Sequence, residues 1–153
     1  MTSPLEDDVD RTLVAQLAAD GRATLSTLAA AAGLSVSATQ ARVRRLEQRG
    51  VIRGYAADVD PEALGLPLAA FVAITPLDPA QPDDAPARLA ELDAVEACYS
   101  VAGEESYLLL VRVPSPRALD DLLTEIRQVA NVRTRTTVVL QTFFERAARP
   151  ERR

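Results

Sequence analysis

The sequence has 153 residues, of which 48% are hydrophobic and 25% charged, as is typical of a globular protein with room for one domain or two small ones. All 17 basic residues are arginine, histidine is absent and Cys98 is the single cysteine, which excludes an internal disulfide and a cysteine-based zinc site and removes the commonest general base. Taken alone, the formal net charge of −5 argues against a nucleic-acid binder, but the distribution of the charges along the chain, described below, changes this interpretation. We expect no metal site and no cofactor, and Cys98 to be buried, as free cysteines usually are.

The first predicted helix starts at Asp7 or Asp8 and ends at Gly21. Acidic residues at its start suit the helix dipole. The preceding residues are acidic and lack an apolar run, so we do not expect a signal peptide. No apolar stretch of the sequence reaches the roughly 18–20 residues that a membrane span needs. We expect a cytoplasmic protein without membrane contact. The apolar face of the first predicted helix, which precedes Gly21, consists of Val9, Leu13, Leu17 and Ala18.

Two further helices joined by a tight turn are predicted next. Gly33 provides the left-handed residue that ends a short helix over Leu25–Ala32, and Ser35 is placed to cap a longer helix over Val36–Arg49. Two helices across such a turn form a helix-turn-helix, whose second helix enters a DNA major groove.

The longer helix has two sides. Its inner side is predicted to consist of Val36, Thr39, Val43 and Leu46. Small residues on the outer side allow a close approach to base edges, and arginines beside them can reach phosphates. A solvated amphipathic helix is the alternative. The predicted DNA-binding residues are Ser35, Ser37, Ala38, Ala41, Arg42, Arg44, Arg45, Gln48 and Arg49.

The charge is distributed unevenly along the chain. Residues 33–55 contain five arginines and one acid, a balance of +4, whereas residues 56–153 contain ten arginines and sixteen acids, a balance of −6. This asymmetry indicates a DNA-facing module joined to a body that stays away from phosphates. Gly50 ends the longer helix, and Val51–Ala57 alternates weakly as a strand or wing would. We therefore predict a winged helix-turn-helix.

Residues 58–67 are rich in turn formers and are predicted to link two domains. The predicted domains are a DNA-binding domain over 1–57 and a second domain over 68–145, followed by a polar tail at 146–153. The second domain is predicted to contain a loop at 78–84, strands at 68–75, 95–101, 107–113 and 133–144, and helices at 85–92 and 116–130.

The order of these elements is strand-helix-strand twice, which is the ferredoxin-like βαββαβ arrangement of an antiparallel sheet. The fold class is therefore α+β. Two helices cover one face of such a sheet, and here the strands are apolar on both faces. The simplest cover for the second face is the same sheet of another copy, so we expect a homodimer.

The chain from Leu5 to about Phe144 resembles the Lrp/AsnC family of feast/famine transcription regulators. The resemblance lies in the order and spacing of five runs, which are DDVDRTLVAQLAADGRAT, LAAAAGLSVSATQARVRRLEQRGVIRGY, VDPEALGL, VAGEESYLL and NVRTRT.

The resemblance implies that sheet domains pair into dimers, that dimers assemble into tetramers or octamers, and that amino acids bind between dimers near the hairpin glycine. The sequence departs from the family pattern, which often has threonine before that glycine and aspartate three residues after it; here these are Ala102 and Ser106. Alternatively, Gly103 only shapes a hairpin. The implied effector residues are Tyr99, Val101, Ala102, Gly103, Glu104, Glu105 and Ser106.

We therefore expect a sequence-specific transcription regulator of double-stranded DNA that responds to a small molecule, expected to be an amino acid. An architectural protein that wraps DNA without an effector is the alternative. Some tetrapyrrole decarboxylases resemble the family, but they rely on histidine and this chain has none, so we do not expect an enzyme. The +4 stretch disfavours a metabolite-binding module that has lost DNA binding.

Overall fold

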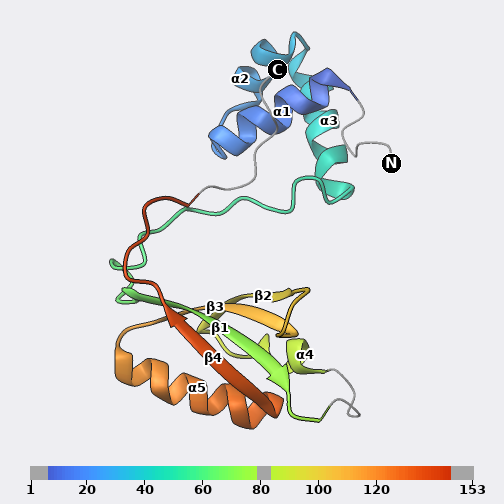
Figure 1. Ribbon diagram of the computed structural model, residues 1–153. Helices are drawn as coiled ribbons and strands as arrows, with labels where there is room; N and C mark the ends of the chain where they lie inside the picture. The colour runs from blue at the N-terminus through green and yellow to red at the C-terminus, as the bar shows by residue number, and fades with distance from the viewer. Residues whose placement is uncertain (1–6, 79–83, 146–153) are drawn as a thin grey trace. The chain divides into compact units, whose positions relative to one another are not determined.

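The computed structural model describes residues 7–78 and 84–145, so the predicted tail at 146–153 and most of the predicted loop at 78–84 lie outside the described residues. The chain divides into two compact units: the second consists of Val59–Phe143, and the described residues before and after it belong to the first. Each unit is described by itself (Figure 1). The predicted bounds of the two domains, 1–57 and 68–145, and of the linker, 58–67, stay predictions.

The first unit contains three helices, α1 (Asp8–Ala19), α2 (Leu25–Ala32) and α3 (Val36–Gln48). Each begins at a side-chain cap that accepts a backbone N–H: Asp7 from Asp10 at 2.8 Å, Thr24 from Thr27 at 3.1 Å, and Ser35 from Ala38 at 3.2 Å. Gly33 ends α2 in the left-handed region at φ 66°. The predicted helix-turn-helix is confirmed, with α3 one residue shorter than expected.

The core of this unit lies where the three helices meet. Leu13 of α1, Leu28 of α2 and Leu46 of α3 are 2% exposed or less, and each contributes about 1.5–3 kcal/mol by leaving water. Val43 and Thr39 complete the buried side of α3. The prediction that Val36 belongs to this side is wrong, since Val36 is 47% exposed. It occupies the first position of the helix, one turn before the buried side begins at Thr39.

The predicted strand over Val51–Ala57 is also wrong. In place of a strand, the backbone N–H groups of Val51 and Ile52 both donate to the Leu46 carbonyl, at 2.9 and 3.2 Å. These bonds complete the C-terminus of α3, which Gly50 ends at φ 69°. A strand also needs a neighbour with which to pair, and residues 7–58 contain no other strand. The described part of this unit is therefore a helix-turn-helix without a wing.

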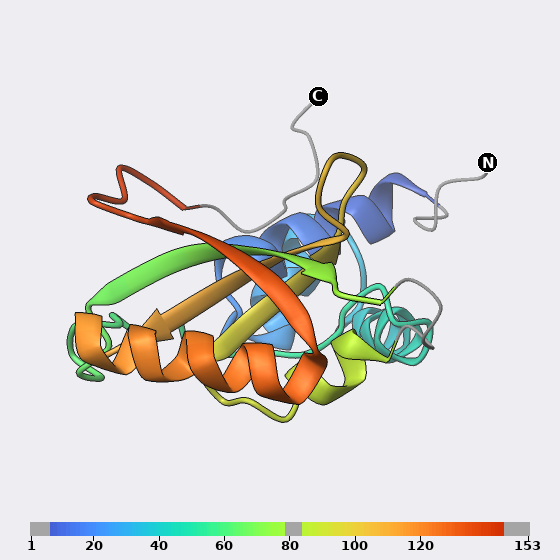
Figure 2. The ribbon, with the colours of Figure 1, turned by 60° about the horizontal axis from the view of Figure 1, so that its bottom comes forward.

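The second unit is a four-stranded antiparallel sheet with two helices. Its elements are β1 (Leu68–Pro76), α4 (Ala85–Leu89), β2 (Val95–Ser100), β3 (Tyr107–Val113), α5 (Pro116–Ala130) and β4 (Val132–Val138). The strand order is β2-β3-β1-β4, which confirms the ferredoxin-like prediction. Figure 2 shows α5 running along one face of the sheet, with α4 beside its C-terminal end.

The core of this unit lies between the helices and that face. Val72 of β1 pairs with Leu109 of β3, and both are fully buried. Ile126 of α5 is also fully buried against them. The buried residues of α5 are Leu119, Leu122, Ile126 and Ala130. Helical spacing predicts the first three of these together with Leu123 and Val129, which are partly buried, and does not predict Ala130.

The opposite face of the sheet carries Phe71 and Ala73 of β1 and their partners Leu110 and Leu108 of β3. Phe71 is 39% exposed. Neither α4 nor α5 packs on this face, so the two helices leave it uncovered, as the sequence predicted. Its centre is apolar, whereas Arg135 and Thr137 of the edge strand β4 lie opposite Ala73 and Phe71 on the same side.

Two details of β2 differ from the prediction. A bulge between Val95 and Ala97 places these residues on opposite faces, whereas strict alternation had placed them on one. Cys98 is exposed, not buried. It pairs with Leu109 on the helix-covered side, but β2 is an edge strand, and Val95 is its only residue packed against the core.

Other elements end earlier than predicted. β4 ends at Val138, six residues before the predicted end, because its partner β1 begins at Leu68 and the last pairing bond runs from Val139 N–H to the Ala69 carbonyl. The predicted strand at 95–101 ends at Ser100. The helix at 85–92 ends at Leu89 and continues as a turn. In the described residues, no helix combines the length and the apolar character that crossing a membrane requires.

Candidate DNA-binding helix and small-molecule cleft

The outer side of α3 faces solvent along its length. Small and polar side chains lie there with arginines beside them, and the buried Thr39, Val43 and Leu46 hold the other side against the unit. Most of the predicted DNA-binding residues share this exposure, namely Ser35, Ser37, Ala38, Ala41, Arg44, Arg45, Gln48 and Arg49. The geometry therefore leaves a rigid helix face accessible to a groove of DNA.

Ser35 has a structural duty at the start of this face. Its Oγ accepts the N–H of Ala38 at 3.2 Å and lies 3.2 Å from the Oγ of Ser37. The cap keeps the first turn of α3 helical. The N-terminus of the helix, with its partial positive charge, is thereby fixed at the surface where a phosphate could approach.

Arg42 is committed to a partner within the unit. Its Nη1 donates to Asp7 Oδ2 at 2.7 Å and to Asp10 Oδ1 at 2.9 Å. Asp10 is fully buried, so this bond compensates a carboxylate that has no access to water. Arg42 was predicted to lie beside DNA, but the structure turns its guanidinium towards α1, so we leave it out of the proposed contact set.

The same cluster shifts two pKa values. The backbone N–H of Asp10, followed by the guanidinium of Arg42, lowers the pKa of Asp7 below its usual value. The hydrogen bonds to Asp10 and then Asp7 raise the pKa of Arg42.

Arg45 is a second arginine near these carboxylates. Its Nη2 lies 4.0 Å from Asp10 Oδ2, and its side chain is 46% exposed. From the sequence, the acids at this end were expected only to start the first helix and to suit its dipole. Arg42, the partner of Asp7 and Asp10, lies more than thirty residues away and left no local signal.

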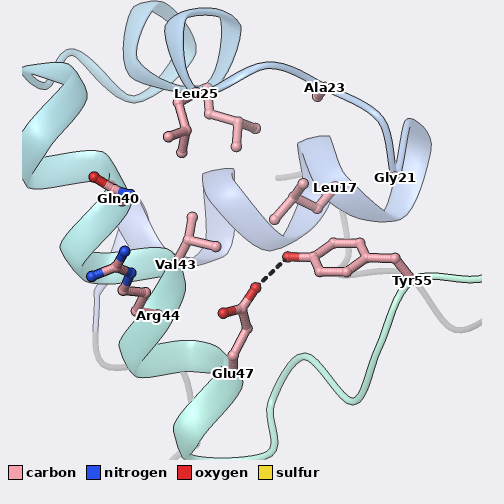
Figure 3. Close-up of a pocket in the computed structure, with 10 residues that line it drawn as sticks. Leu17, Gly21, Ala23, Leu25, Gln40, Val43, Arg44, Glu47 and Tyr55 are labelled. Atoms are coloured by element: carbon pink, nitrogen blue, oxygen red, sulfur yellow. Dashed lines mark hydrogen bonds between the residues drawn. The ribbon is translucent and has the colours of Figure 1, made fainter.

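A cavity of about 290 Å³ lies between the helices of the first unit (Figure 3). Leu17, Leu25 and Val43 contribute apolar walls. The hydroxyl of Tyr55 donates to Glu47 Oε1 at 2.8 Å (Figure 3). Burial, followed by this hydrogen bond, raises the pKa of Tyr55 to about 12. The segment after α3, expected to form a wing, is thus attached to α3 through Tyr55.

A second cleft, of about 330 Å³, lies in the sheet unit at the turn between β2 and β3. It combines turn residues with side chains from the uncovered side of β1, β3 and β4. Its lining consists of Phe71, Ala73, Val101, Ala102, Gly103, Glu105, Tyr107, Leu108, Arg135 and Thr137.

Four of the predicted effector residues line this cleft, and three do not. Tyr99 and Glu104 are exposed outside its lining. Ser106 closes the turn through its backbone, because its N–H donates to the Ile74 carbonyl at 3.0 Å and its carbonyl accepts the N–H of Val101 at 3.1 Å.

Arg135 is the main lining residue that sequence reasoning missed. Its guanidinium forms an ion pair with Glu105. The two residues come from β4 and from the turn, thirty positions apart, so their proximity follows from sheet register and not from a local pattern. No cluster of three potential metal ligands occurs within 7–78 and 84–145.

Comparisons with known proteins cover both units. Residues 7–47 match the family model described as the AsnC-type helix-turn-helix domain, and residues 69–148 match the Lrp/AsnC ligand binding domain. The chain is 71% identical over 138 residues to the HTH-type transcriptional regulator LrpA of Mycobacterium tuberculosis, which covers 90% of this chain and 92% of that protein.

Two other relatives extend the comparison. The Leucine-responsive regulatory protein of Salmonella typhimurium is 38% identical over 140 residues, which is 88% of this chain and 85% of that protein. The solved structure of a feast or famine regulatory protein from M. tuberculosis, complexed with L-methionine, matches with a TM-score of 0.91 and 69% identity, covering 94% of this chain and 99% of that one.

Proposed function

The chain belongs to the Lrp/AsnC family of transcription regulators, and on that premise we propose that α3 reads double-stranded DNA and that an amino acid bound in the sheet cleft modulates this binding. The observation that carries the DNA-binding part is the exposed side of α3. Ala38 and Ala41 let its backbone approach base edges, which Ser37 and Gln48 can then bond. The arginines beside them supply phosphate contacts.

Arg45 is the arginine best placed to test this assignment, because its guanidinium is half exposed beside the outer side of α3. Arg45→Ala should weaken binding to all DNA sequences alike and lower the slope of log K against log salt by about 1. Fluorescence anisotropy with specific and scrambled duplexes over a salt series measures both effects. Arg117→Ala, an equally conservative loss of one charge on the exposed first turn of α5, is the matched control and should leave the slope unchanged. A loss confined to the specific duplex would make Arg45 a base reader.

The effector part rests on the cleft at the β2–β3 turn. Its volume of about 330 Å³ is at the small end of the range of about 300–1,000 Å³ for ligand pockets, which suits a single amino acid. Phe71, Ala73 and Leu108 offer apolar contacts, which suits an aliphatic or thioether side chain. One relative is named as leucine-responsive and another was solved with L-methionine, and both ligands have such side chains.

The uncovered sheet face supports a homodimer, and further assembly of dimers into a tetramer or octamer belongs to the same proposal. Leu110 lies in the middle of this face, paired with Phe71 on one side and Ala97 on the other. Leu110→Glu should place an unpaired charge in the interface and release monomers. Sedimentation velocity measures the change, and an unaltered distribution of species would refute this choice of interface.

A two-fold dimer would recognise inverted repeats with half-sites about one helical turn apart or a multiple of it. As a DNA-binding regulator, the protein is proposed to act in the cytoplasm. An architectural role without an effector is the competing function, and it would leave DNA affinity unchanged by every amino acid.

A further inference from the structure

The cavity between the helices of the first unit has no role in the function proposed above. It measures about 290 Å³, and its lining residues lie between Leu17 and Tyr55 of the sequence. Its apolar part is built on the core of the unit, because Leu28 and Val43 are buried and Leu25 is partly buried beside them. Since ligand pockets start at about 300 Å³, a cavity of this size suits a small molecule.

One side of this cavity is polar. Gln40, Arg44 and Glu47 follow one another along α3 at spacings of four and three residues, which are the spacings of neighbours on one side of a helix (Figure 3). Arg44 is exposed and forms no hydrogen bond or ion pair with any residue within 7–78 and 84–145. The cavity therefore combines apolar walls with a cation that no carboxylate of these ranges neutralises.

Tyr55 accounts for the absence of a carboxylate partner at Arg44. Opposite charges three residues apart on a helix commonly pair, and Glu47 stands at this spacing from Arg44. Instead, Glu47 Oε1 accepts the hydroxyl hydrogen of Tyr55 at 2.8 Å (Figure 3). The Tyr55 ring also bounds the cavity beside Gly21, since a Cβ on Gly21 would lie 3.9 Å from Tyr55 Cδ1. The hydrogen bond engages Glu47 and leaves Arg44 available to an anion from solution.

The chemistry of these residues favours a carboxylate with an apolar body. A guanidinium can donate two parallel N–H bonds to a carboxylate, and the amide of Gln40, one turn earlier, can donate another. An aliphatic chain beside the apolar walls would leave water, which is favourable. The carboxylate of Glu47 is already bound to Tyr55, so the cavity does not require an ammonium group in its ligand.

We propose that this cavity binds a short aliphatic carboxylate, whose charged group binds Arg44 and Gln40 and whose body lies against the apolar walls. Arg44 also belongs to the side of α3 that is proposed to contact DNA, so a bound carboxylate occupies a guanidinium that would otherwise contact a phosphate. The ligand therefore lowers the affinity for DNA. The site itself is independent of the proposed function, whereas its effect on DNA rests on that function.

Isothermal titration calorimetry of the full chain tests the site. The probes are 4-methylpentanoate, acetate, which lacks most of the apolar body, and 4-methylpentanamide, which lacks the charge. The wild-type protein should bind 4-methylpentanoate, and each of the other probes should bind at least about tenfold more weakly, because it loses either the apolar contacts or a charged hydrogen bond.

Two variants remove different parts of the site. Arg44→Gln should weaken binding of 4-methylpentanoate by about 10–100-fold, because a charged hydrogen bond is lost. Ala23→Leu fills part of the cavity and should also weaken binding, although every charge is kept. Arg22→Gln is the matched control, since Arg22 is exposed beside Gly21 but does not line the cavity, and it should leave the affinity unchanged. Far-UV circular dichroism checks that each variant keeps its fold.

Fluorescence anisotropy with a labelled duplex at constant ionic strength tests the effect on DNA. Saturating 4-methylpentanoate should lower the DNA affinity of the wild-type protein by up to about tenfold, the contribution of one charged contact. It should also lower the slope of log K against log salt by about 1. Acetate at the same concentration should change neither quantity, and Ala23→Leu should bind DNA without responding to 4-methylpentanoate.

The outcomes separate this inference from the proposed function. If 4-methylpentanoate does not bind the wild-type protein, or binds Arg44→Gln and Ala23→Leu equally well, the site is refuted and the proposed function stands. Binding at the site that leaves DNA affinity unchanged refutes the regulatory part. If the wild-type protein does not bind DNA at low salt, the proposed function fails and the regulatory part fails with it, while calorimetry still decides whether the site exists.

Discussion

The bond between Arg42 and Asp10 predicts a large effect on stability from a substitution on the recognition helix. Asp10 is fully buried, and Arg42 Nη1 lies 2.9 Å from its Oδ1. Arg42→Ala would remove the nearer cation of this carboxylate and leave Arg45, whose Nη2 lies 4.0 Å from Asp10 Oδ2, and removing one partner of a buried pair costs about 3–5 kcal/mol. The Arg42 side chain is 28% exposed, so water can enter part of the space that it leaves. We therefore expect a loss just below that range, about 2–3 kcal/mol.

Urea unfolding followed by far-UV circular dichroism at fixed protein concentration measures this loss. Arg44→Ala, which removes an exposed arginine two residues away, is the matched control and should change the free energy of unfolding by no more than about 0.5 kcal/mol. The Asp10→Asn,Arg42→Ala double variant should be less destabilised than the sum of the single variants, because no buried charge remains unpaired. The reasoning is refuted if Arg42→Ala and Arg44→Ala are equally stable.

Two further predictions concern pH. The Asp10 N–H and then Arg42 lower the pKa of Asp7, so the ionised form of Asp7 stabilises the fold above its ordinary pKa of 3.8. This contribution is lost as the pH falls. The comparison variant is Asp7→Asn, whose amide still caps α1; the difference in stability between it and the wild type should be constant above about pH 5 and shrink below about pH 4. A difference that stays constant in acid would contradict this. Burial and Glu47 raise the pKa of Tyr55 to about 12, so the stabilising contribution of Tyr55 is present below about pH 10 and is lost as the pH rises towards 12. The titration of Tyr55 is the difference in tyrosinate absorbance between the wild type and Tyr55→Phe, and its midpoint should lie near pH 12. A midpoint near the ordinary value of about 10 would contradict the described environment of Tyr55.

Local signals were sufficient for the helices. Ser35 caps α3 and Gly33 ends α2 as predicted, because capping depends on residues within one turn of the helix end. The βαββαβ order could also be predicted, since strands and helices differ in the period of their apolar residues.

Features that depend on distant partners could not be predicted in this way. The expected wing failed because whether Val51–Ala57 forms a strand depends on a neighbouring strand, which the described unit lacks. The end of β4 follows from where β1 begins. The bulge at Val95 and Ala97 moved residues between faces, and alternation along one strand carries no sign of it.

The candidate sites show the same division. Helical phase identified the exposed side of α3, but Arg42 reaches Asp10, which lies 32 positions away, and phase alone cannot show where a long side chain ends. The glycine turn pointed to the cleft, whereas Arg135 joins it only through the register of β4 against β1.

The central claim is that this protein binds DNA through α3 under the control of an amino acid. The most direct test is a titration of the purified full chain against DNA from its own promoter region, at several salt concentrations, with and without a panel of amino acids. The account predicts sequence-selective binding whose affinity changes with one or a few apolar amino acids. Selective binding that no amino acid alters would contradict the effector part and favour an architectural protein, and the absence of binding at low salt would contradict the assignment of α3.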